Sequence, residues 1–109
     1  MATKGIPDDI KQAAIASVEH FNRTAMGDSQ CSYVPRFKGR YLYLDRSDLG
    51  NHGPICRLTY TGDLAHWDFA IYKYSDGVYD PTEWFFPGAE EVDGTIEGAM
   101  RAGLKAYPA

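Results

Sequence analysis

The sequence has few of the features expected of an exported or membrane-bound protein. Its 109 residues include only two cysteines, Cys31 and Cys56, which is too few for a disulfide framework. No apolar run approaches the roughly 20 residues that cross a bilayer, and the first nine residues lack the apolar centre of a signal peptide. These absences predict a cytoplasmic protein with reduced cysteines. A single Cys31–Cys56 bridge is the one alternative in an oxidising compartment.

The signatures of common catalytic and metal sites are also missing. There is no Gly-x-Ser-x-Gly elbow and no phosphate-binding glycine loop with its lysine. His52 and Cys56 form the one short Cys/His spacing, and no second pair completes a zinc site. Segment 45–54 does not fit a calcium loop, because Leu49 and Cys56 stand where its fifth and twelfth positions need oxygen ligands. The sequence therefore predicts no catalytic residue, no metal and no cofactor; a chemical role for His52 is left open.

The net charge of −4 is unevenly distributed along the chain. Residues 31–74 carry six bases and four acids, whereas residues 75–97 carry seven acids and no base. The acidity of the whole chain argues against non-specific binding to nucleic acid or anionic membranes. We expect the acidic segment to attract the weakly basic one within the molecule.

Helical periodicity is confined to the two ends of the chain. After Pro7, which suits a first helical turn, one apolar stripe is formed by Ile10, Ala14, Val18 and Phe21. A second stripe, following the expected cap Asp93, is formed by Ile96, Met100, Leu104 and Tyr107. Glycine weakens a helix by about 1 kcal/mol relative to alanine. Gly98 and Gly103 therefore indicate that the second helix packs closely on its neighbours.

Four runs rich in aromatic and β-branched residues lie between the helices and predict strands. They are residues 31–37, 40–46, 55–61 and 66–74. The first two are expected to form a hairpin through Lys38-Gly39, with Phe37 opposite Arg40. Pro35 cannot donate to a sheet, which places the first strand at an edge. The turn-rich segment 45–54 is expected to be a loop.

Short connections between consecutive strands predict an antiparallel meander. The expected fold is a single α+β domain over residues 1–109, a two-layer sandwich in which both helices cover one face of a four-stranded sheet. Residues 78–94 are expected to form an irregular connector. Its aromatic trio, Trp84-Phe85-Phe86, should fold back onto the body, because burial of one large aromatic contributes about 1.5–3 kcal/mol.

Strand alternation divides the side chains of the sheet into two sets. The inward set is Tyr33, Leu42, Leu44, Leu58, Phe69 and Ile71. The outward set is Arg36, Tyr41, Tyr43, Arg57, Thr59, Tyr72 and Tyr74. Tyrosine and arginine are enriched at binding hot spots. We therefore expect a non-enzymatic module that binds a partner protein or a second copy of itself through Arg36, Tyr41, Tyr43, Arg57, Tyr72 and Tyr74.

Three alternatives stay open at this point. The tyrosines and arginines can stabilise the sheet without any ligand. A small enzyme or ligand binder would use a pocket between segment 45–54 and connector 78–94, lined by His52, Asp48, Trp84 and Phe85. Single-stranded nucleic acid could stack on the same sheet face, although the net charge disfavours it.

Overall fold

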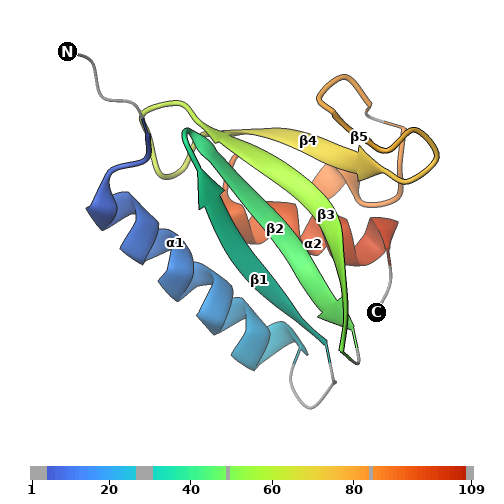
Figure 1. The fold of residues 1–109 in the computed structure, drawn as a ribbon, viewed down its shortest axis with the longest axis horizontal. Helices are drawn as coiled ribbons and strands as arrows, with labels where there is room; N and C mark the ends of the chain where they lie inside the picture. The colour runs from blue at the N-terminus through green and yellow to red at the C-terminus, as the bar shows by residue number, and fades with distance from the viewer. Residues whose placement is uncertain (1–4, 27–30, 49, 84, 108–109) are drawn as a thin grey trace.

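The fold is a two-layer α+β sandwich, as the sequence predicts. The computed structural model describes residues 5–26, 31–48, 50–83 and 85–107. Helix α1 (Asp8–Phe21) continues into a π-helical turn, η1 (Asn22–Met26), and helix α2 (Ile96–Ala106) ends the described chain. Figure 1 shows both helices beside one antiparallel sheet. The side chain of Asn22 exchanges two hydrogen bonds with the backbone of Tyr33, which ties the end of the first helical segment to the sheet.

The sheet is a meander of five strands in sequence order. The strands are β1 (Cys31–Lys38), β2 (Tyr41–Asp48), β3 (Asn51–Tyr60), β4 (Trp67–Lys73) and β5 (Val78–Asp80). The predicted sheet lacked β5, whose three residues pair with Ile71–Lys73. A segment this short has no alternation to reveal it in the sequence. Strand β1 is an edge strand, as Pro35 indicates.

The prediction of a loop over residues 45–54 is wrong. Strand β2 runs to Asp48 and β3 begins at Asn51, so these two residues pair directly across the end of a long hairpin. A bulge next to Leu44 leaves Ile55 as an extra residue on β3 and keeps the rest of the hairpin in register. Backbone pairing with a neighbouring strand thus overrides the turn propensity of the Asp, Ser, Asn and Gly residues.

The turn between β1 and β2 lies one residue later than the sequence suggested. Lys38 pairs with Tyr41, so the turn residues are Gly39 and Arg40, and Phe37 faces Leu42 rather than Arg40. Gly39 has a φ of 59°, the left-handed conformation that the first position of a tight turn requires. Each residue's partner differs from the predicted one by two positions. Because strand side chains alternate with a period of two, every side chain keeps its predicted face.

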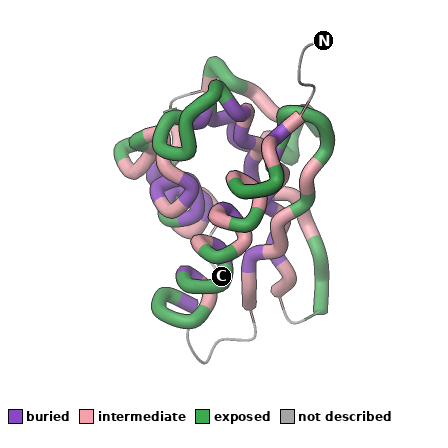
Figure 2. Tube along the Cα trace, turned by 90° about the vertical axis from the view of Figure 1, so that its left-hand side faces the viewer, coloured by how far each residue is buried: buried purple, intermediate pink, exposed green. Residues whose placement is uncertain are grey.

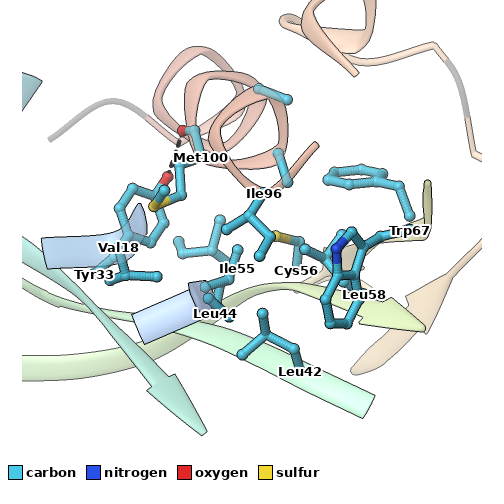
Figure 3. Close-up of a cluster of buried hydrophobic side chains, with 14 of the residues drawn as sticks. Val18, Tyr33, Leu42, Leu44, Ile55, Cys56, Leu58, Trp67, Ile96 and Met100 are labelled. Carbon is cyan, nitrogen blue, oxygen red and sulfur yellow. Dashed lines mark hydrogen bonds between the residues drawn. The ribbon is translucent and has the colours of Figure 1, made fainter. Parts of the chain in front are cut away.

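The core lies between the sheet and the two helices. All six predicted inward residues, Tyr33, Leu42, Leu44, Leu58, Phe69 and Ile71, are buried. Val18 of α1 and Met100 of α2 pack into the same cluster (Figure 3). The Tyr33 hydroxyl donates to the Met100 carbonyl at 2.8 Å, which satisfies a polar group inside the core. Figure 2 shows the buried positions as short stretches among intermediate and exposed ones.

Of the two described members of the aromatic trio, Phe86 packs against the sheet and Phe85 lies in solvent. The Phe86 ring stacks on Phe69, with centroids 5.9 Å apart, while Gly88 lies against Ala102 of α2. Phe85 is 98% exposed, so the expectation that it folds back is wrong. The Phe85 N–H donates to the Glu83 carboxylate, which also accepts from Lys73, so polar contacts rather than burial of the Phe85 ring hold this part of the connector. Trp84 lies outside the described residues.

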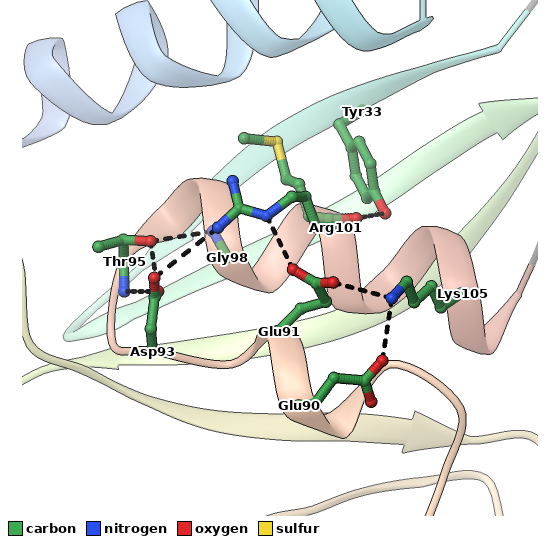
Figure 4. A network of polar contacts seen from close by, with 9 residues as sticks. Tyr33, Glu90, Glu91, Asp93, Thr95, Gly98, Arg101 and Lys105 are labelled. Carbon is green, nitrogen blue, oxygen red and sulfur yellow. Dashed lines mark hydrogen bonds and ion pairs between the residues drawn. The ribbon is translucent and has the colours of Figure 1, made fainter.

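An ion-pair network holds the connector to α2 (Figure 4). Glu91 accepts hydrogen bonds from Arg101 and Lys105, and Glu90 accepts one from Lys105. Glu90 and Glu91 therefore pair with α2. Three other acids of the same segment pair with Lys73 of β4, as expected from the charge distribution: Asp76, Asp80 and Glu83. The residue that caps α2 is Thr95 rather than Asp93: its hydroxyl accepts from the Gly98 N–H at 2.9 Å, while Asp93 accepts from Thr95.

The network predicts a loss of stability in acid. Hydrogen bonds from Lys105 lower the pKa of both Glu90 and Glu91 from the ordinary 4.5. A carboxylate whose pKa is lowered by folding stabilises the protein above its ordinary pKa, and that stabilisation is lost as the pH falls through the lowered value. We expect the thermal midpoint, followed by circular dichroism from neutral pH into acid, to fall less steeply in a Glu90→Gln/Glu91→Gln variant than in the wild type.

Glu19→Gln is the matched control for this experiment. Glu19 is an exposed glutamate of α1 outside the network, so its replacement should leave the slope in acid unchanged. Equal slopes for the wild type and the double variant would show that the network does not contribute to stability.

Candidate functional site

The face of the sheet opposite the helices carries a cluster of aromatic and basic side chains. Leu42 and Leu44 point into the core, so Tyr41 and Tyr43, which alternate with them on β2, point away from it. The residues of the cluster, here named the tyrosine face, are Arg36, Tyr41, Tyr43, Arg57, Tyr72, Tyr74 and Tyr79. Six of these seven were predicted from the sequence. Tyr79 was missed because it lies on the unpredicted strand β5.

The rings of the tyrosine face form a continuous series across the sheet. Ring centroids are 5.9 Å apart between Tyr41 and Tyr43, and 5.3 Å apart between Tyr43 and Tyr79. Tyr72 then lies 5.0 Å from Tyr79 and 4.9 Å from Tyr74. The rings are tilted or edge-to-face, which is the geometry that aromatic pairs prefer. The series therefore forms one ordered aromatic surface rather than scattered exposed residues.

Two arginines lie over these rings. Arg36 forms an ion pair, and Arg57 forms none with the described residues. The Arg36 guanidinium is 4.3 Å from the Tyr43 centroid, and its Nε donates to Asp45 at 3.1 Å. The Arg57 guanidinium is 4.6 Å from the Tyr41 centroid and 5.4 Å from that of Tyr79. In the described part of the chain, the buried Nε of Arg57 has no hydrogen-bond partner and the guanidinium forms no ion pair. Arg57 is thus held by aromatic rings without a balancing carboxylate.

The tyrosine side chains differ in exposure across the face. Tyr41 and Tyr74 are exposed, whereas Tyr43, Tyr72 and Tyr79 are half-buried. Burial raises the pKa of Tyr79, and the nearby Asp45 carboxylate raises it further, so its hydroxyl stays protonated. The face therefore presents flat aromatic surfaces, hydroxyl groups and one cation without an ion pair among the described residues, and tyrosine and arginine are enriched in protein interfaces.

Tyr74 belongs only to the rim of the tyrosine face. It lies just beyond the end of β4, and its hydroxyl donates to the Pro54 carbonyl at 2.7 Å. Its ring also packs edge-to-face on Tyr107, with centroids 5.2 Å apart, where the C-terminal end of α2 meets the sheet. Tyr74 thus connects the tyrosine face to the opposite side of the sheet.

The predicted pocket is divided between two hollows. His52 and Asp48 line one of about 390 Å³, near the end of the β2–β3 hairpin. Phe85 lines another of about 450 Å³, together with Lys73 and Glu83. His52 also lines a further hollow with Tyr79, at the start of the connector. Tyr74 and Tyr107 border both of the hollows named above. Trp84, the fourth expected lining residue, lies outside the described residues.

Other chemical sites find no support within the residues that the structure describes. No group of three or more His, Cys, Asp or Glu side chains there could hold a metal ion, and no helix there is long and apolar enough to cross a membrane. Burial raises the pKa of the Cys56 thiol, which stays neutral inside the core. Comparisons with protein-family models, curated proteins and solved structures found no match.

Proposed function

We propose that this protein is a non-enzymatic interaction module that binds a partner protein through the tyrosine face. The partner would supply an acidic side chain to Arg57 and apolar or aromatic side chains to the surrounding rings. The observation that carries the proposal is the position of Arg57, which is half-buried between Tyr41 and Tyr79 and has no carboxylate partner among the residues that the structure describes. Tyrosine and arginine at the centre of a surface are the residues that dominate binding energy in protein interfaces.

A purely stabilising role accounts less well for Arg57. Cross-strand pairs of aromatic and charged residues contribute about 0.2–1 kcal/mol each. A buried donor without a hydrogen-bond partner costs about 1–3 kcal/mol, and the Nε of Arg57 is such a donor. The arrangement therefore costs the isolated domain stability, and an acidic group of a partner would recover part of it.

The charges of the face favour a different protein over a second copy of this chain. In a symmetric dimer the same surface meets itself, which brings the arginines of the two faces toward each other. Asp45, the carboxylate beside the face, already accepts from Arg36. A partner with its own acidic residues avoids this repulsion. The homodimer is the alternative that the experiment below also tests.

The test is a selection of peptides from a displayed random library on the immobilised protein. We expect the selected peptides to combine an acidic residue with aromatic or apolar neighbours, because these pair with Arg57 and stack on the tyrosines. A Tyr41→Ala/Tyr43→Ala/Arg57→Ala variant should lose at least about tenfold in affinity for a selected peptide, equivalent to about 1.4 kcal/mol. Isothermal titration calorimetry would measure the affinity, and circular dichroism would verify the fold.

Arg23→Ala removes an exposed arginine from η1, outside the face, and should leave the affinity unchanged. Peptides without acidic residues, or equal affinities for the wild type and the triple variant, would contradict the proposal. A dimer in sedimentation analysis that the triple variant abolishes would identify the partner as a second copy. Strongly salt-dependent binding of single-stranded DNA would instead support the nucleic-acid alternative.

A further inference from the structure

A buried arginine lies on the other side of the sheet from the tyrosine face. Arg46 follows Leu42 and Leu44 on the inward side of β2 and is only 3% exposed. Its Nε donates to the two carboxylate oxygens of Asp48 at 2.9 Å and 3.1 Å. Its Nη1 is buried and has no hydrogen-bond partner in the described part of the chain. The pairing with Asp48 explains how the charge can be buried, but most buried polar side-chain atoms have a hydrogen-bond partner, so Nη1 still requires an explanation.

Arg46 forms part of the wall of the hollow near the end of the β2–β3 hairpin. The hollow has a volume of about 390 Å³, within the range of small-molecule sites. Its polar lining includes Asn51 and His52, and its apolar lining is Ile55 and the rings of Tyr74 and Tyr107. The lining also includes the Asp48 carboxylate, so the hollow combines a polar wall that carries one buried cation with an apolar wall. Such a combination can hold a charged ligand with an apolar body.

The hydroxyl groups near Arg46 are already engaged as donors. Tyr33 donates to the Met100 carbonyl, Tyr74 to the Pro54 carbonyl, and Tyr107 to the Tyr72 carbonyl. The other side chains of the lining that can donate to a ligand are Arg46, Asn51 and His52, and Arg46 carries a fixed positive charge. The planar guanidinium has separate edges, so a ligand oxygen bound at the edge away from Nε does not need to displace Asp48.

We propose that this hollow binds a small monocarboxylate whose carboxylate group accepts hydrogen bonds from Arg46. The apolar body of the ligand lies against Ile55 and the ring of Tyr107. The Asp48 carboxylate offsets much of the charge of Arg46, which favours a ligand with one negative charge over a phosphate dianion. The site lies on the side of the sheet opposite Arg57, and Tyr74 is the one residue of the tyrosine face that the described lining of the hollow includes.

Titration of the ¹⁵N-labelled protein with benzoate, followed by NMR, tests the proposal. We expect saturable shifts of the Arg46 Nε–H and of the Asn51 and Gly53 amides. Benzyl alcohol, which has the ring without the charge, and acetate, which has the charge without the ring, should each bind at least about tenfold more weakly. Inorganic phosphate should also bind more weakly, because its second charge meets Asp48.

Two variants separate the hollow from other cationic surfaces. Arg46→Gln should abolish the benzoate shifts, and Arg36→Gln, which alters an exposed arginine on the tyrosine face, should preserve them. If Arg46→Gln does not fold, Ile55→Val offers a second test, since its smaller side chain should weaken benzoate and leave acetate unchanged. Absence of saturable shifts in the wild type, or shifts centred on Arg57, would overturn the proposal.

Discussion

Replacing Leu58 with alanine is expected to lower the free energy of unfolding by about 2–5 kcal/mol. Leu58 is 1% exposed and lies on the central strand β3, between Leu42 on β2 and Phe69 on β4. Deleting its three outer carbon atoms removes buried apolar surface and leaves a cavity that the paired strands on both sides cannot readily close. Urea denaturation followed by circular dichroism would measure the change.

Leu64→Ala is the matched control, because it deletes the same atoms from an exposed position. Leu64 is 38% exposed in the connection between β3 and β4, and its replacement should change the stability by no more than about 0.5 kcal/mol. A loss below about 1 kcal/mol at Leu58 would mean that this side chain does not face the core. The assignment of the tyrosine face to the opposite side would then fail as well.

The fold class could be predicted because its signals are local. The four-residue steps of Val18 and its neighbours, and the alternation of Trp67, Phe69 and Ile71, give the element types directly. The two faces of the sheet follow from the same alternation. They survive the error in the first turn, since that error displaces the strand pairing by an even number of residues.

The features that could not be predicted depend on pairing between strands. Val78–Asp80 becomes a strand only because the edge of β4 offers it hydrogen-bond partners. Segment 45–54 has the composition of a loop, yet each of its two halves pairs with the other. Local propensity contains no information on whether a partner strand is near, and these errors follow from that limit.

The candidate sites also contain some features that the sequence predicts and others that it does not. Alternation places Tyr41, Tyr43 and Arg57 on one face. The second ring beside Arg57 belongs to Tyr79 on β5, so this contact could be found only from the three-dimensional structure. Arg46 could have been found from the sequence, because it continues the inward alternation of Leu42 and Leu44. The expectation of a loop from Asp45 onward hid that signal.

Replacing Gly103 with alanine is expected to destabilise the protein by about 1–2 kcal/mol, although alanine has the higher helix propensity. Alanine favours a helix over glycine by about 1 kcal/mol. A Cβ atom at Gly103, however, would meet the Tyr33 hydroxyl and would lie 2.5 Å from Cγ2 of Ile55. Overpacking of this kind costs about 1–3 kcal/mol. It would also disturb the hydrogen bond from Tyr33 to the Met100 carbonyl, which joins β1 to α2.

A double-mutant cycle isolates the cause of this expected loss. Tyr33→Phe removes the hydroxyl oxygen that the new methyl group would meet, so Gly103→Ala should cost less in that background than in the wild type. Chemical denaturation of the four proteins gives the coupling energy. A stabilising effect of Gly103→Ala in the wild type would mean that α2 lies farther from the sheet than the structure places it. Gly103 would then be an ordinary weak point of the helix rather than the position that lets α2 approach β1 and β3.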